Sequence, residues 1–185
     1  MKLKASPRFD RLGAFIVDYV LYMTVISIFM ILMYFIDQRD LSGNVTLAGF
    51  SSTMRILVNI TGILIYLGLT VFVPTKIFPG QSIGKKVMQL KVVTSNQGVA
   101  KWYHYLAREI FGALTLEGTT LVYMVSNLTR DLLAILLKLD QQIIQQWQTI
   151  ATFIFIFSVL LAALTPQRRM FKDYLAQTQV ITVKE

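Results

Sequence analysis

One stretch decides the fold: residues 12–36, LGAFIVDYVLYMTVISIFMILMYFI, which contain a single charged side chain, Asp18. About 20 consecutive apolar residues are enough for a helix to cross the roughly 30 Å hydrocarbon core of a bilayer. An ionised side chain in that core costs roughly 2.5–3.5 kcal/mol on insertion scales, so it normally has a partner or a water-filled site. The stretch therefore indicates a membrane protein, and Asp18 is its first candidate functional residue.

Three further apolar runs follow along the chain, at residues 56–73, 110–128 and 149–165. The run at 110–128 is the least hydrophobic of them, because it contains Glu117 together with glycines and threonines. Each run is close to the length that a membrane-spanning helix needs. We therefore predict an all-α membrane protein, a four-helix transmembrane bundle that forms a single domain over residues 1–185.

The composition excludes several functional classes. The 185 residues are 55% hydrophobic with a mean hydropathy of +0.57, and they include no Cys and a single His, His104. Disulfides, thiolate metal sites and clusters of imidazole ligands are thereby excluded within one chain. No Ser, His and acid trio is placed for nucleophilic catalysis. We expect no enzyme activity, no cofactor and no metal site.

The basic residues predict the orientation in the membrane. Fourteen of the 18 Lys and Arg lie in residues 1–11, in residues 74–109 and in the tail after residue 165. Basic residues gather in the cytoplasmic segments of membrane proteins, so both termini and a loop at 74–109 should be cytoplasmic, with four crossings of the cell membrane. The net charge of +8 favours contacts with anionic lipid headgroups of the bilayer. The sequence has no stripe of basic residues interleaved with stacking aromatic residues, so we expect no nucleic-acid partner.

Two segments outside the runs also have recognisable patterns. Residues 130–148 place Leu, Ile and Trp at helical spacing among charges and glutamines, which predicts an amphipathic helix. This helix would either lie on the outer surface or continue the third span. Residues 87–94 read as a short strand before a turn, and residues 177–183 show a similar alternation. We expect these two strands to pair beneath the membrane as a small cytoplasmic loop-and-tail element.

The charged residues inside the runs form a repeated arrangement. Arg11 and Asp18 are seven residues apart, so they share a helix face roughly 10 Å apart along the axis. Arg108 and Glu117 repeat this order at the third run, so Asp18 and Glu117 should lie at similar depth, about 10 Å inside the inner boundary. Buried carboxylates at one level must be protonated, ion-bound or paired. They indicate either a cation or proton site open to the cytoplasm or a structural polar cluster that fixes helix register.

Three motifs resemble one known family. The first is RLGAFIVD at residues 11–18, the second is GQSIGKKVMQLKVV at residues 80–93, and the third is RMFKDYLAQTQV at residues 169–180. Together they are similar to the opening, middle and closing segments of RDD family membrane proteins. That family is named for one Arg and two Asp, and the motifs frame about residues 8–183 of this chain.

The resemblance implies a cytoplasmic-membrane protein for which both transport and adaptor roles have been suggested. It implies that Asp173, the second Asp, is a partner for Arg11 or Arg108, whereas the residues alone favour a solvated tail carboxylate. Lys172 stands where a His often precedes this Asp, and Gln177 replaces a usual Gly. Two functions from different classes therefore stay open.

The first is a small transporter or a cation/proton exchange component. In it Asp18 and Glu117 would bind the ion, while Arg11, Arg108 and Asp173 would act at the cytoplasmic side. The second is a non-catalytic adaptor or assembly factor that recruits a partner protein. Four short helices leave little room for a complete pathway, so a transporter would need to be a homo-oligomer or to join a partner membrane protein.

Overall fold

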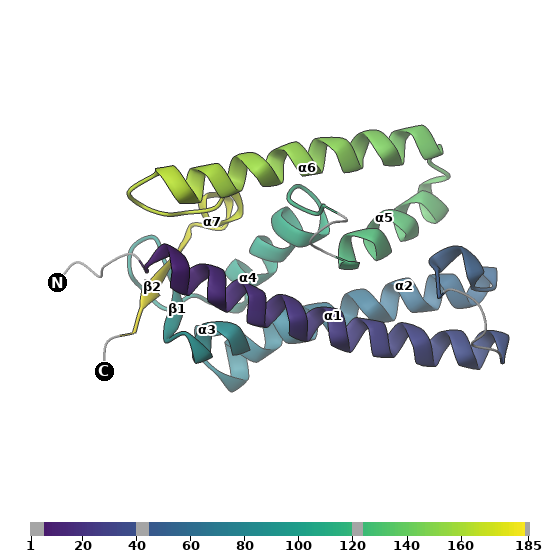
Figure 1. Cartoon of the computed structure of the whole chain (residues 1–185), viewed down its shortest axis with the longest axis horizontal. Helices are drawn as coiled ribbons and strands as arrows, with labels where there is room; N and C mark the ends of the chain where they lie inside the picture. Colours follow the sequence, from purple (N-terminus) through teal and green to yellow (C-terminus); the bar gives the residue numbers. More distant parts are fainter. Residues whose placement is uncertain (1–5, 40–44, 120–123, 184–185) are drawn as a thin grey trace.

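The computed structural model describes residues 6–39, 45–119 and 124–183, and most of these residues are helical (Figure 1). The elements follow the chain in the order α1 (Arg8–Gln38), η1 (Leu47–Gly49), α2 (Ser52–Leu67), η2 (Gly68–Ile77), α3 (Ile83–Val87), β1 (Leu90–Thr94), α4 (Trp102–Glu109), η3 (Ile110–Leu114), α5 (Met124–Leu137), α6 (Gln141–Leu164), α7 (Phe171–Leu175) and β2 (Thr178–Thr182). Of these, η1 is a 3₁₀ turn, whereas η2 and η3 are π-helical. The predicted helical architecture with a small sheet is therefore confirmed.

Three helices of the described chain are long and apolar enough to cross a membrane: α1, α2 continued by η2, and α6. They contain the first, second and fourth predicted runs and extend beyond most of their ends, because backbone hydrogen bonding continues into the polar flanks. The far ends of α1 and α2 are joined by Asp37, whose carboxylate accepts hydrogen bonds from the Ser51 N–H and hydroxyl, each at 2.7 Å. These two helices therefore form an antiparallel pair.

The third predicted span, residues 110–128, is not one continuous helix, so the four-helix bundle is not confirmed. The helical backbone breaks at Gly112 (φ −91°, ψ −110°), and α5 begins only at Met124. The Gly112 carbonyl accepts the N–H groups of Thr115 and Glu117 at 3.3 and 3.0 Å, which closes a turn in place of a helix. Glycines at 112 and 118 weaken a helix here. Residues 120–123 lie outside the described residues.

The amphipathic segment predicted at residues 130–148 is not one helix either. Its first part ends α5, and its second part begins α6. The break lies at Lys138, which has a left-handed backbone (φ 51°), and at Asp140, whose extended backbone precedes the first residue of α6. Asp is favoured at such helix starts because its side chain competes with helical hydrogen bonds. The segment therefore joins two helices at a sharp turn.

The two predicted strands do pair. β1 and β2 are antiparallel, from Leu90 opposite Thr182 to Thr94 opposite Thr178. The first predicted strand is shorter than expected, because Val87 is the last residue of α3. Ser6 adds the N-terminal arm to this sheet, since its backbone N–H and hydroxyl both donate to the Val180 carbonyl at 3.3 Å. We call α3, β1, α7 and β2 together the cap.

The cap lies at the same end of the molecule as the start of α1 (Figure 1). Behind it, α1, α2 and α5 enclose the main apolar core, which includes Ile26, Val58, Val125 and Leu128. A second, smaller core joins Ala14 of α1 to Leu90, Val92 and Val180 of the sheet. Apolar packing therefore holds the cap against the first two turns of α1.

Gly84 lets α3 approach the backbone of α1. A Cβ at this position would lie 2.1 Å from the Ala14 carbonyl oxygen and 2.9 Å from Cγ of Asp18. Since the first of these atoms belongs to the backbone of a packed helix, it cannot move aside cheaply. Gly84 is therefore required for the observed contact between α3 and α1.

We expect Gly84→Ala to lower the free energy of unfolding by about 2–3 kcal/mol, because overpacking forces α3 away from α1. The matched control is Gly68→Ala, since a Cβ there meets no atom within 4 Å. The control should be neutral or stabilising by up to about 1 kcal/mol. Denaturation by SDS titration in mixed micelles measures both variants, and an equal effect of the two would contradict the packing described here.

Candidate functional site

Asp173 of α7 lies between two arginines that come from different helices. Its Oδ2 atom is 2.9 Å from Nη2 of Arg11 in α1, and its Oδ1 atom is 3.0 Å from Nη1 of Arg108 in α4. The Asp173 side chain is fully buried, and Arg108 is 6% exposed. Arg108 also donates to the hydroxyl of Thr178 in β2 at 3.3 Å. One carboxylate of the tail is therefore joined directly to α1 and α4.

The charges of this cluster stabilise one another. Burial alone would raise the pKa of the Asp173 carboxyl, but the positive charges of Arg108 and Arg11 outweigh burial and hold this pKa below its ordinary value. Burial would likewise lower the pKa of Arg108, and Asp173 reverses that effect and raises it. Both groups are therefore charged at neutral pH. Because proton exchange is most efficient when a pKa lies near the ambient pH, Asp173 is poorly suited to it.

Asp18 of α1 binds the start of α3. Its carboxylate accepts hydrogen bonds from the Ser82 hydroxyl at 2.5 Å and the Gly84 N–H at 2.7 Å. Nζ of Lys85 lies 3.6 Å from the same carboxylate. Asp18 is 6% exposed, so its charge is compensated by this loop instead of by bulk water. The motif at residues 80–93 thus supplies the partners that a carboxylate in an apolar helix needs.

Glu117 lies in the turn between η3 and α5 and is fully buried. It accepts hydrogen bonds from the Ser158 hydroxyl of α6 at 2.5 Å and from the Lys172 N–H of α7 at 2.9 Å. Nζ of Lys172 is 3.6 Å from its Oε2 atom. Glu117 therefore joins the broken third passage to α6 and to the cap.

The predicted residues fall into three contact sets. Arg11, Arg108 and Asp173 are in direct contact, whereas Asp18 and Glu117 each bind their own set of partners. Within residues 6–39, 45–119 and 124–183, no hydrogen bond or ion pair joins Asp18 to Glu117. The contacts therefore give no support to a pair of carboxylates that shares a proton.

Two lysines complete the contact sets of Asp18 and Glu117, and neither was predicted from sequence as a site residue. Lys85 pairs with Asp18, and Lys172 pairs with Glu117. Signals for both exist: Lys85 follows Gly84 in the middle motif, and Lys172 replaces the His that the resemblance leads one to expect before Asp173. Lys172 therefore supplies, at this position, the amine that pairs with Glu117.

A separate polar group lies between α2 and α5, and it also escaped prediction. Asp131 accepts hydrogen bonds from Nε of Arg55 at 2.8 Å and from Nδ2 of Asn59 at 2.7 Å. Arg130, next to Asp131, donates to the Gly118 carbonyl at 2.5 Å and so helps to satisfy the backbone of the broken passage. These contacts join partners that are far apart in sequence, so no local sequence pattern predicts them.

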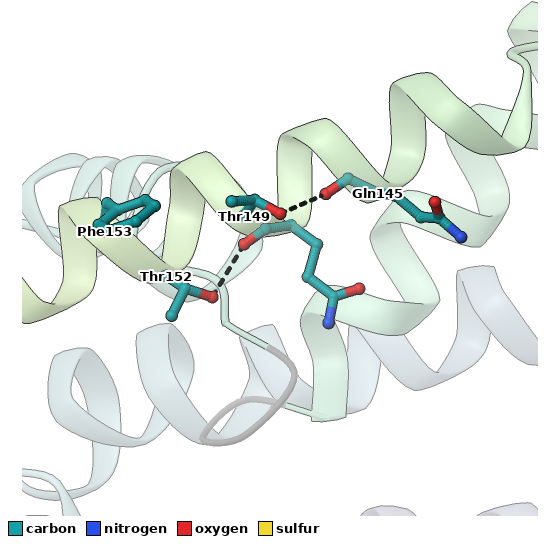
Figure 2. A pocket seen from close by; sticks show the side chains of 5 residues that line it. Gln145, Thr149, Thr152 and Phe153 are labelled. Atoms are coloured by element: carbon teal, nitrogen blue, oxygen red, sulfur yellow. Dashed lines mark hydrogen bonds between the residues drawn. The ribbon is translucent and has the colours of Figure 1, made fainter.

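A shallow surface pocket lies along α6, and none of the cluster residues lines it (Figure 2). Its lining residues are Gln145, Gln148, Thr149, Thr152 and Phe153. The hydroxyls of Thr149 and Thr152 donate to the backbone carbonyls of Gln145 and Gln148 one turn earlier, at 3.0 and 2.9 Å. These hydroxyls are therefore satisfied within the helix, and the pocket offers few free polar groups.

The chain was compared with known proteins. Residues 5–177 match the model of the RDD family. No curated protein and no solved structure matches the chain. The match covers nearly the whole chain and includes the first two motifs, most of the third and the five predicted site residues, so the resemblance is confirmed.

We expect Asp173→Asn to lower the free energy of unfolding by about 3–5 kcal/mol, because it leaves two arginines buried without their counter-charge. Asp140→Asn is the matched control, since Asp140 is exposed and its side chain does not cap α6. Its effect should stay within about 0.5 kcal/mol. SDS titration in mixed micelles compares the two variants. A loss below about 1 kcal/mol for Asp173→Asn would show that the arginines do not depend on this carboxylate.

Proposed function

Because the chain belongs to the RDD family, we propose that it is a non-catalytic membrane adaptor whose helices hold the cap in position for a partner protein. One observation carries this proposal: each of the three predicted carboxylates already has a cationic partner from the same chain. The pairs connect separate elements, so their effect is to fasten the cap to the apolar helices.

The charge balance favours an adaptor over an ion carrier. The three buried acids of the described residues, Asp18, Glu117 and Asp173, form ion pairs with Arg11, Lys85, Arg108 and Lys172. An incoming cation would have to displace a lysine or arginine that is fixed in the fold. Breaking such a pair leaves a buried charge uncompensated, which is strongly unfavourable. The cluster is therefore better suited to holding a structure than to releasing ions repeatedly.

The proposed orientation puts the cap in the cytoplasm. The basic residues of the N-terminal arm, the segment 74–109 and the tail favour that side of the cell membrane. With three spanning helices, the chain needs one further passage from the cap to the start of α6, which the broken segment from α4 to α5 would provide. The chain would then be a multi-pass protein with both termini in the cytoplasm.

The surface for a partner is best sought near α4. Val99 is 75% exposed, and Trp102 and Tyr103 are 58% and 47% exposed beside the exposed Lys101. Exposed aromatic side chains are enriched at protein–protein contacts. The partner would be a second membrane protein or another copy of this chain.

A second candidate is cation or proton exchange at Glu117. Its Oε2 atom is buried without a hydrogen bond in the described chain, and it lies where the third passage is broken. In transporters, broken helices often line the ion site near the middle of the membrane. Glu117 is therefore the residue at which transport would have to be tested.

Two measurements separate the candidates. In liposomes of the purified chain, we expect proton and monovalent-cation fluxes equal to those of protein-free liposomes. In native membranes, we expect a photo-crosslinker at Val99 to capture one and the same protein repeatedly, with less capture in Asp173→Asn and full capture in Asp140→Asn. A flux that Asp18→Asn or Glu117→Gln abolishes would overturn the adaptor and establish transport.

A further inference from the structure

The length of α1 places α3 at the level of the lipid headgroups. α1 has 31 residues, which is about 46 Å of helix, against a hydrocarbon core of roughly 30 Å. Its far end leaves the core near Ile36, because Asp37 binds the polar start of α2. Counting about 20 residues back from Ile36 reaches Val17. Asp18 then lies at the inner boundary of the core, and so does α3, which it binds.

The same turns of α1 carry an apolar row that suits contact with lipid. Leu12, Ile16 and Val20 are 54%, 50% and 56% exposed, and they occupy one face of the helix. Large apolar side chains in such a row are stable against acyl chains and not against water. Because α3 packs on another face of these turns, at Ala14 and Asp18, its own outer side must also meet the lipid.

The outer side of α3 and the end of η2 beside it combine apolar and basic residues, and we call this surface the lysine patch: Lys76, Ile77, Phe78, Lys86 and Val87. Val87 is 63% and Ile77 is 52% exposed. Nζ of Lys86 lies 3.5 Å above the centre of the Phe78 ring, so the two ends of the patch touch. Such a patch can place its apolar side chains among acyl chains while its amines reach the headgroups.

The lysines of the patch need a negative partner from outside the chain. Residues 74–108 contain no Asp or Glu. In the described part of the chain, Lys76 and Lys86 form no ion pair with an acidic side chain, in contrast to Lys85, which binds Asp18. The contact of Lys86 with Phe78 neutralises no charge. At the headgroup level, the phosphate of an anionic phospholipid supplies that charge.

We propose that the lysine patch is a binding surface for anionic phospholipid headgroups of the inner leaflet. Lys76 and Lys86 contact the phosphate region, while Ile77, Phe78 and Val87 lie against the first acyl carbons. Through Asp18 and Gly84, a lipid seated on this surface also presses α3 onto α1. Lipid binding at this surface requires no partner protein, so it can be tested separately from the adaptor role.

The test uses the full chain in nanodiscs made of equal parts phosphatidylcholine and phosphatidylglycerol. After mild extraction into detergent, native mass spectrometry counts the phospholipids of each kind that remain bound. We expect the wild-type chain to retain phosphatidylglycerol preferentially. Lys76→Gln and Lys86→Gln should each reduce that preference about fivefold, since a basic residue near a membrane surface contributes about 1 kcal/mol to binding.

Two controls keep the test decisive. Lys138→Gln changes an exposed lysine at the turn before α6 and should leave the preference for phosphatidylglycerol unchanged. Lys86→Arg keeps the positive charge and should therefore keep the wild-type preference. An unchanged preference in Lys76→Gln and Lys86→Gln would overturn the proposal. A photo-crosslinker at Val87 that captured an acidic protein in place of lipid would overturn it as well.

Discussion

The fold depends on the pairing of Asp173 with Arg11 and Arg108. A carboxylate that is fully buried beside apolar helices is stable only when its charge is compensated where it lies. Here the compensation comes from the first residues of α1 and from α4, which are 162 and 65 positions away along the chain. The net contribution of this ion pair to stability is smaller than the stability that is lost when one partner is removed. Its main effect is therefore to specify one position for the tail.

The same rule explains the other two carboxylates. Asp18 accepts the start of α3, and Glu117 accepts α6 and α7, so each acid fixes a different part of the molecule to its neighbours. All three contacts involve the cap, and together with the small sheet they surround the start of α1. A cap fixed this firmly on apolar helices suits the proposed role of presenting a surface at the membrane, to which the proposed lysine patch would add a lipid-binding part.

The parts that could be predicted from sequence are those set by local pattern. Long apolar runs predicted α1, α2 and α6, and alternation predicted β1 and β2, because both signals depend on neighbouring residues. The third span failed where Gly112 and Glu117 break the helix, since hydropathy does not reveal that Glu117 accepts a hydrogen bond from Ser158 of α6. Asp131 was missed for a related reason: its ion pair with Arg55 joins distant elements and leaves no trace in spacing.

The most direct test of this account is the distance distribution between α1 and α7. Because the chain has no Cys, spin labels can be placed cleanly through Leu12→Cys and Leu175→Cys, at positions that are 54% and 42% exposed. Pulsed electron paramagnetic resonance in nanodiscs should give one narrow distance, and adding Asp173→Asn should broaden it while Asp140→Asn does not. A distribution that stayed equally narrow without the Asp173 charge would contradict the central role of this ion pair.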